Sequence, residues 1–167
     1  MRLCGADELF FHPDVVSFYN NIIDNWYSNK KIALLLGCSM HKPYSKSFMH
    51  KKVIGLLRKH GLDDYVQQYI IGEPMVVVPR ELENIYPATS YDFHPSNLGE
   101  LGRNILIERL RAFFKKAIKM HERFVVYAPN HHKKIILAAC ENLFEPIVIP
   151  YTVYRLPDLL NLLKYEL

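Results

Sequence analysis

The sequence has little of several features that mark specialised classes of protein. Its three cysteines, Cys4, Cys38 and Cys140, are an odd number and lie far apart, so we expect no disulfide framework and a reducing, cytoplasmic location. No apolar run approaches the ~20 residues that a membrane span needs. The N-terminal residues contain no signal-peptide core. We therefore expect no contact with a membrane.

Repeats and low-complexity segments are also missing, and the composition is that of a folded protein. Hydrophobic residues make up 50% of the chain, which is enough to bury a core, and we expect one domain over residues 1–167. The net charge of +4 is small. It permits contact with a polyanion but does not by itself indicate one.

Helical and strand patterns alternate along the chain. Apolar residues at helical spacing, with prolines and glycines near their ends, predict helices over 12–27, 45–60, 98–121, 133–142 and 157–167. Short runs rich in apolar and β-branched residues predict strands over 31–38, 65–71, 74–78, 124–128 and 146–150. Residues 84–95, with two prolines, are predicted to form a loop. The alternation predicts an α/β protein whose mainly parallel sheet is covered by helices on both faces.

Chemically active side chains are crowded into residues 37–50, GCSMHKPYSKSFMH. This stretch follows the first predicted buried strand. Residues 128–134, APNHHKK, follow a later one. Open α/β sheets bind ligands beyond the carboxyl ends of their strands. The sequence therefore predicts a site where these two stretches meet.

The individual residues of the first stretch each allow a functional and an ordinary interpretation. Cys38 could be a nucleophile, because lysines and a helix N-terminus favour a thiolate, or a small core residue. Lys42 is presented from a turn that the following proline stiffens, or it is simply solvated. His50 could transfer protons or orient a substrate, or it could be a packed histidine. Ser45 or Ser47 could cap the following helix.

Metal binding is the weakest of these interpretations. Cys38, His41 and His50, with His131 or His132, offer suitable donor atoms. Their spacing fits no familiar zinc pattern. We therefore expect no metal, and we expect no cofactor.

The order and spacing of residues 38–50 carry more information than the separate residues. They follow the pattern Cys-x3-Lys-Pro-Tyr-x2-Ser-x2-His. This pattern resembles the signature of the archaeosine synthase family, archaeal tRNA-modifying enzymes related to the tRNA-guanine transglycosylases. Flanking blocks are similar and in the same order: Phe11–Val15, Pro79–Glu83, Tyr86-Pro87 and Tyr91-Asp92. The resemblance covers about residues 9–120, and Gly37 stands where the family usually has proline.

The resemblance implies a fold and a reaction. The fold is a three-layer α/β/α arrangement similar to that of uracil-DNA glycosylases. The substrate is a tRNA carrying 7-cyano-7-deazaguanine in its D-arm, and an amine adds to the nitrile to give an amidine. Glutamine, ammonia and lysine are all compatible nitrogen sources. Full-length members also carry a transglycosylase-like region and an RNA-binding PUA domain, so we expect a partner protein that supplies one of them.

The resemblance also implies roles for individual residues. Cys38 would form a thioimidate, and His50 would transfer protons. Lys42 would donate to the developing nitrogen anion or hold a phosphate. Asp92 would orient a cation or accept a proton from the amine. The base would stack on Tyr44. The expected substrate-binding residues are Ser39, Tyr44, Ser47, Tyr91, Asn130 and His131.

Basic side chains could line the rim of the crevice and hold tRNA, or they could form an ordinary solvated face. They are Lys30, Lys31, Lys51, Lys52, Arg58, Lys59, Lys133 and Lys134. Two other functions stay open. One is a non-catalytic tRNA-binding or scaffolding domain, and the other is a different nucleobase-handling enzyme on a glycosylase-like fold.

Overall fold

A five-stranded sheet lies at the centre of the computed structural model, which describes residues 2–165. The strand order is β4 (Val76–Pro79), β3 (Val66–Gly72), β2 (Ile32–Gly37), β6 (Arg123–Tyr127) and β7 (Ile147–Val148). Neighbouring strands from β3 to β7 pair in parallel, and β4 pairs antiparallel with β3. The predicted α/β class with a mainly parallel sheet is confirmed.

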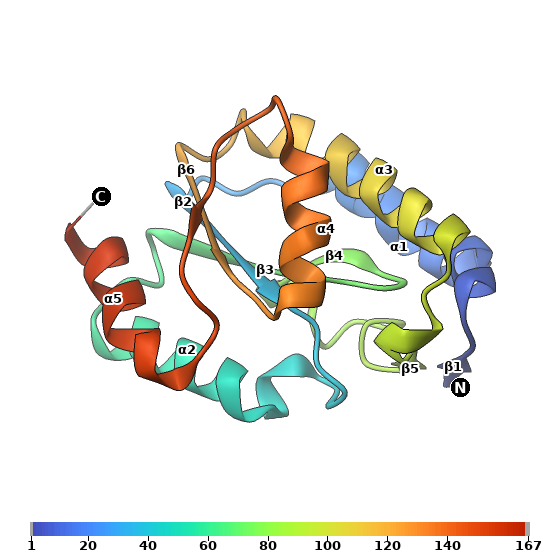
Figure 1. The fold of residues 1–167 in the computed structure, drawn as a ribbon, viewed down its shortest axis with the longest axis horizontal. Coiled ribbons are helices and arrows are strands. Elements are labelled where there is room, and N and C mark those ends of the chain that lie inside the picture. The colour runs from blue at the N-terminus through green and yellow to red at the C-terminus, as the bar shows by residue number, and fades with distance from the viewer. Residues whose placement is uncertain (1, 166–167) are drawn as a thin grey trace.

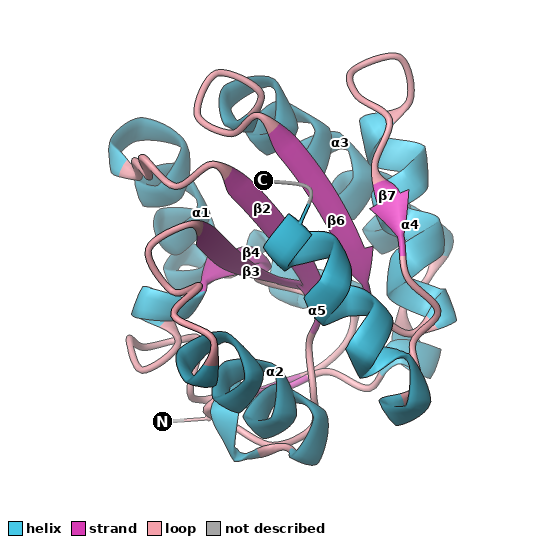
Figure 2. Cartoon of the chain, turned by 90° about the vertical axis from the view of Figure 1, so that its left-hand side faces the viewer, coloured by secondary structure: helices cyan, strands magenta, loops and turns pink. Residues whose placement is uncertain are grey.

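Helices cover both faces of this sheet (Figures 1 and 2). One layer contains α1 (Pro13–Asn25), α3 (Glu100–Ala117) and α4 (Asn130–Cys140), and the other contains α2 (Phe48–Lys59) and α5 (Leu156–Tyr165). Strand β2 shows why, since Leu35 packs into the first layer and Leu34 and Leu36 pack into the second. Successive strand side chains point to opposite faces, so an unbroken apolar run serves both layers.

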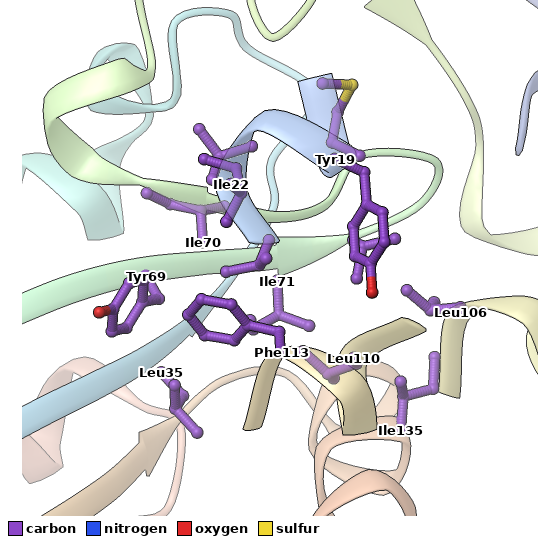
Figure 3. Packing of buried hydrophobic residues seen from close by; sticks show 14 of the residues in the cluster. Tyr19, Ile22, Leu35, Tyr69, Ile70, Ile71, Leu106, Leu110, Phe113 and Ile135 are labelled. Carbon is purple, nitrogen blue, oxygen red and sulfur yellow. The ribbon is translucent and has the colours of Figure 1, made fainter. Parts of the chain in front are cut away.

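The larger core cluster joins the sheet to α1 and α3 (Figure 3). Phe113 of α3 meets the ring of Tyr69 of β3 edge to face, with 5.1 Å between the ring centroids. Ile22 of α1 and Leu110 of α3 are fully buried in the same cluster. Truncating such a side chain to alanine typically costs about 2–5 kcal/mol. This packing holds the strand ends that carry the site.

Two helices begin about a turn away from their predicted first residues. Helix α2 starts at Phe48 rather than Ser45, because the side chain of Ser47 accepts a hydrogen bond from the His50 N–H and caps the helix. The residues before it form a separate 3-10 turn. Helix α4 starts at Asn130 rather than Lys133, with Pro129 at the cap position. Both adjacent histidines therefore lie in the first turn of α4.

The segment 84–95, predicted as a loop, contains a short strand. β5 (Tyr91–Asp92) pairs in parallel with β1 (Leu3–Cys4) near the N-terminus. The prediction missed this pairing because two residues carry no periodicity, and the partner lies far away in the sequence. The pairing brings the N-terminal strand beside the segment that carries Tyr91 and Asp92.

The other elements lie close to their predicted ranges. The predicted closing helix corresponds to α5, and its last two residues fall outside the described residues. Within residues 2–165, no helix is both long and apolar enough to cross a membrane.

Candidate functional site

Cys38 stands immediately beyond the carboxyl end of β2. Its backbone N–H donates to the carbonyl of Ile71 in β3 at 2.9 Å, which fixes it between two central strands. Its side chain is only partly buried. This is the edge at which open α/β sheets bind ligands, as the sequence predicted for this residue.

Two buried residues from neighbouring strand ends accompany the thiol. His132, in the first turn of α4, places Nε2 3.3 Å from Cys38 Sγ. Glu73 follows β3 and is 0% exposed. Its Oε1 lies 3.6 Å from His132 Nε2, and its Oε2 lies 3.3 Å from His131 Nε2. The ends of β2, β3 and β6 thus bring a thiol, an imidazole and a carboxylate together.

The charges of this cluster support one another. Burial alone would lower the pKa of His132, but Cys38 and Glu73 beside the ring outweigh that cost and raise the pKa to about 10. Burial alone would raise the pKa of Glu73, but the two histidines lower it below its ordinary value. The raised pKa favours the imidazolium form of His132, whose Nε2 contacts both the Glu73 carboxylate and the Cys38 sulfur.

Two glycines make this approach possible. A Cβ added to Gly72 would lie 2.4 Å from Cys38 Sγ, and one added to Gly37 would lie 2.9 Å from His132 Nδ1. Both distances are shorter than real Cβ contacts allow. The sulfur and the imidazole therefore pack against bare backbone, and the cluster depends on both glycines.

A pocket of about 220 Å³ opens beside Cys38. Cys38 is the member of the cluster that lines this pocket, and His132 and Glu73 lie behind it. The lining residues are Cys38, Ser39, Met40, Lys42, Asp92, Phe93, His94 and Pro95. Four of the residues predicted for the site thus share one pocket: Cys38, Ser39, Lys42 and Asp92.

Lys42 is held in a defined position on the pocket wall. Its ammonium donates to the backbone carbonyl of Ser39 and lies 4.4 Å from the ring centroid of Tyr91. Burial lowers the pKa of Lys42 below its ordinary value, although Cys38 and Asp92 oppose this. A partly desolvated ammonium of this kind is a good hydrogen-bond and proton donor.

Tyr44 and Tyr91 are buried next to Lys42 and do not line the pocket. Their hydroxyls are 2.8 Å apart, and each side chain is 1% exposed. Burial raises the pKa of both phenols well above the ordinary value. No open ring face of Tyr44 is available for a base in this structure, and the pair instead supports Lys42 from beneath.

His50 is buried, and both of its ring nitrogens are engaged. Nε2–H donates to the Gly37 carbonyl at 2.8 Å, and Nδ1 accepts from Arg80 at 2.7 Å. Burial, with the nearby Arg80 charge, lowers the pKa of His50 to about 4. Arg80 also pairs with Glu83 at 2.9 Å. The structure thus gives His50 contacts that position the end of β2.

The remaining predicted residues occupy the edges of the site. Asp92 is paired with Arg2, with Oδ2 2.6 Å from the Arg2 Nε, and this pairing lowers the pKa of Asp92. The hydroxyl of Ser39 donates to the backbone carbonyl of His41 at 2.9 Å. Ser47 caps α2, while Asn130 is exposed at the start of α4 and does not line the Cys38 pocket.

Comparison with known proteins places the chain in a family. Residues 15–155 match the family described as a domain of unknown function, DUF5591. The chain belongs to this family. The match covers both the Cys38 stretch and the histidines of α4. Cys38, Glu73 and His132, which we call the thiol cluster, therefore all lie in the DUF5591 region.

Three curated relatives of this DUF5591 domain carry related names. Archaeosine synthase subunit alpha of Thermoplasma acidophilum is 32% identical over 146 residues, which is 86% of this chain and 26% of the relative. The same subunit of Methanosarcina acetivorans is 38% identical over 91 residues, 54% of this chain and 14% of the relative. Archaeosine synthase of Methanocaldococcus jannaschii is 31% identical over 127 residues, 74% of this chain and 21% of the relative. The resemblance predicted from the sequence is confirmed.

These relatives are much longer proteins, and the chain spans about a quarter of their length or less. One solved structure, AF0587, described as a protein of unknown function, has a TM-score of 0.65 at 22% identity. The structural match covers 89% of this chain and 48% of the AF0587 chain. The likeness supports the fold alone, and the predicted similarity to uracil-DNA glycosylases stays a prediction.

The thiol cluster of this DUF5591 domain could also hold a metal ion. Donor atoms of Cys38, Glu73 and His132 all lie within 4.8 Å of one another. A metal-bound histidine normally donates its other ring N–H to an acceptor. His132 Nδ1 has no hydrogen-bond partner among residues 2–165, so that support is missing. We therefore interpret the cluster as an acid–base group, and the absence of a metal stays a prediction.

The sequence reasoning missed Glu73 and considered His132 only as a possible metal ligand. Glu73 stands alone between two apolar strands, and no local pattern distinguishes it from an ordinary turn residue. One signal was available, because a carboxylate at the end of a predicted central strand lies at the expected site edge. The start of α4 was placed after His132, which hid its place in the first turn.

Proposed function

We propose that this domain adds an amine to the nitrile of 7-cyano-7-deazaguanine in tRNA, with Cys38 as the nucleophile. The observation that carries the proposal is the 3.3 Å contact between Cys38 Sγ and His132 Nε2 beside an open pocket, with Glu73 buried behind. The names of the relatives supply the substrate class. A nitrile carbon is an electrophile that a thiolate attacks readily.

In the first step Cys38 bonds to the nitrile carbon. The thiol gives its proton to His132 Nε2, which lies 3.3 Å from the sulfur, and Glu73 stabilises the imidazolium that forms. As the carbon–sulfur bond forms, one carbon–nitrogen π bond breaks and the nitrogen takes a proton. His132 is shielded behind the sulfur, so Lys42, which lines the pocket, is the donor. The product is a neutral thioimidate linked to Cys38.

In the second step an amine replaces the sulfur. The amine nitrogen bonds to the thioimidate carbon and gives up one proton, which restores the Lys42 ammonium. The carbon–sulfur bond then breaks, and Cys38 leaves as a thiolate beside the His132 imidazolium. The net change is addition of one amine to one nitrile, which yields an amidine. Ammonia and lysine satisfy this balance directly, and glutamine satisfies it once water has hydrolysed its side-chain amide to ammonia and glutamate.

The proposal is tested with tRNA bearing 7-cyano-7-deazaguanine. The purified chain is incubated with glutamine, ammonium or lysine in turn, and nucleoside masses are read. We expect a mass increase that matches one donor, and none with Cys38→Ala. Cys140→Ala is the matched control, because Cys140 lies in α4 away from the pocket. Full activity of Cys38→Ala would overturn the covalent scheme.

A non-catalytic tRNA-binding domain is the second candidate. It is favoured by the exposed cations of α2, Lys51, Lys52, Arg58 and Lys59, which can contact a polyanion without taking part in chemistry. It predicts tRNA binding without any change in nucleoside mass, and binding that Cys38→Ala leaves intact. Binding of the free base without tRNA would instead favour another nucleobase-handling enzyme.

A further inference from the structure

Positive charge is concentrated in one part of the chain. Residues 25–62 hold eight of the 21 Lys and Arg residues and none of the 17 Asp and Glu residues. This segment has a formal charge of +8, so the rest of the chain carries −4 to give the total of +4. The segment contains β2, the loop that carries Cys38, and α2. The modest net charge therefore hides a strongly basic region beside the site.

Helix α2 places most of this charge on one stripe of its surface. Its exposed residues recur at helical spacing and share the face that points away from the sheet: Phe48, Lys51, Lys52, Gly55, Arg58 and Lys59. The opposite face, with Val53 and Leu57, is buried against the core. We call these six exposed residues the α2 stripe.

The four cations of the α2 stripe have no acidic or hydrogen-bonding partner in the described part of the domain. Among residues 2–165, none of their side chains forms an ion pair or a hydrogen bond. Lys51 and Lys52 lie in the first half of α2, whereas a helix dipole favours cations at its C-terminal end. The helix dipole therefore gives no reason for these two lysines.

Packing within the domain also does not explain the glycine at position 55, at the centre of the α2 stripe. A Cβ at this position would meet no atom within 4 Å, so packing does not require glycine. Glycine inside an exposed helix is less favourable than alanine. A bare backbone between cations does, however, allow a ligand to approach closely.

The α2 stripe also contains an exposed aromatic residue, Phe48. Phe48 is 62% exposed at the start of α2, where the loop from Cys38 ends, and Lys52 Nζ lies 5.3 Å from its ring centroid. Proteins that bind unpaired nucleic acid combine cations that contact its phosphate backbone with exposed aromatic rings on which its bases stack. An interfacial membrane helix would instead turn an apolar face outward, and that face of α2 is buried.

We infer that the α2 stripe binds the sugar-phosphate backbone of the RNA that carries the substrate base, with Phe48 stacking on an unpaired base next to it. The cations at 51–52 and 58–59 are separated by about 10 Å along the helix, at 1.5 Å per residue. They therefore follow a length of RNA that leads to the loop of Cys38. The inference rests on the proposed function for the identity of the RNA, but not for the binding itself.

The test measures binding without chemistry. An unmodified tRNA transcript is titrated by fluorescence anisotropy over a series of KCl concentrations. We expect Lys51→Gln/Lys52→Gln to weaken binding more than fivefold and to reduce the salt slope by about 1–2, since each phosphate contact contributes about 0.7–0.9. The control is Lys115→Gln/Lys119→Gln, which removes the same charge from the α3 region in the opposite helical layer. It should change affinity by less than twofold.

Two single variants refine the test. Gly55→Ala should raise the melting temperature yet weaken tRNA binding, a combination that a merely solvated helix would not give. Phe48→Ala should weaken binding, while Phe11→Ala, another exposed phenylalanine, should not. Equal salt slopes for the stripe and control double variants would overturn the inference. So would binding to anionic phospholipid vesicles as tight as binding to tRNA.

The outcomes separate this inference from the proposed function. If the stripe variants lose tRNA binding while the wild-type chain leaves the nitrile unchanged, the inference stands and the proposed function falls. If the wild-type chain forms product and the stripe variants bind tRNA normally, the proposed function stands and the inference falls.

Discussion

At the scale of single residues, the buried carboxylate of Glu73 is the group on which we expect the charge of His132 to depend. It contacts both histidines of α4, and one of them also contacts the Cys38 sulfur. Breaking one side of a buried charge pair leaves the other side uncompensated in a poorly solvated place. The charge state of His132, and through it that of the sulfur, should therefore depend on Glu73.

The variant Glu73→Gln tests this dependence. We expect the pKa of His132 to fall, the free energy of unfolding at neutral pH to drop by about 3 kcal/mol, and alkylation of Cys38 to slow severalfold. Iodoacetamide labelling at pH 7, read by mass spectrometry, measures the last effect, with the exposed Cys4 as an internal reference. An unchanged ratio of Cys38 to Cys4 labelling would show that Glu73 does not act on the sulfur.

The same pair has a defined pH dependence. The folded pKa of His132, about 10, lies above its ordinary value of 6.5. Its contribution to stability is therefore complete below about pH 6.5 and is lost as the pH rises through 10. Urea unfolding of Glu73→Gln should show a flatter decline over this range than the wild type.

Part of the site could be predicted from the sequence, and part could not. Cys38, Lys42, Ser39 and Asp92 come together because a short spacing pattern and a strand end place them at one edge. His132 and Glu73 reach the same point through parallel pairing of β6 and β3 with β2, which are long-range contacts. No local pattern reports which distant strand end lies beside a given thiol.

At the scale of elements, a chain of polar contacts ties the start of α2 to the end of β2. Glu83 accepts a hydrogen bond from the backbone of Ser45 and pairs with Arg80, which donates to His50, which in turn donates to the Gly37 carbonyl. Both ends of the loop between Gly37 and α2 are therefore held. This loop carries Cys38 and Lys42.

Acid should weaken this connection. The pKa of His50 in the folded protein, about 4, lies below its ordinary value of 6.5, so its stabilising contribution is present above pH 6.5 and is lost as the pH falls through 4. The difference corresponds to roughly 3 kcal/mol at 1.36 kcal/mol per pH unit. Chemical denaturation between pH 7 and 4 should show this loss in the wild type.

The matched variant is His50→Gln, whose amide can donate to Gly37 and accept from Arg80 without titrating. Its free energy of unfolding should vary less with pH than that of the wild type. His121, whose pKa burial also lowers, is present in both proteins and cancels in the comparison. Parallel curves for the two proteins would contradict the assignment to His50.

Element types were predictable because the apolar runs are long enough to show their period. β2 is apolar throughout and is covered on both faces, while α3 shows a long helical repeat. The two-residue strands β1 and β5 give no such signal. The prediction missed the start of α4 because Asn130, His131 and His132 are weak helix formers. The contacts of the two histidines with Glu73 override that preference.

At the scale of the whole molecule, charge and chemistry lie on different parts of the surface. The thiol pocket opens at the carboxyl edge of the sheet, whereas the α2 stripe runs back along one helical layer. A domain this small offers few phosphate contacts. A partner protein that shares the binding of tRNA stays a prediction.

The isolated chain should therefore bind tRNA weakly and with a strong dependence on salt. We expect a Kd within about 10⁻⁶–10⁻⁴ M at physiological salt, as is typical of nonspecific binding. With four phosphate contacts, affinity should fall on the order of a hundredfold between 50 and 200 mM KCl. Titration at these two concentrations measures the change. Tight binding that salt leaves unaffected would contradict a surface dominated by the α2 stripe.

Gly72 offers a way to sort the relatives of this domain. Its position leaves no room for a Cβ beside the Cys38 sulfur, and Gly37 is similarly restricted by His132. A relative that keeps the cysteine but carries a side chain at the place of Gly72 must have moved its sulfur away from the imidazole. A glycine at the place of Gly72, together with the cysteine, would then separate domains equipped for covalent chemistry from those that retain only the fold.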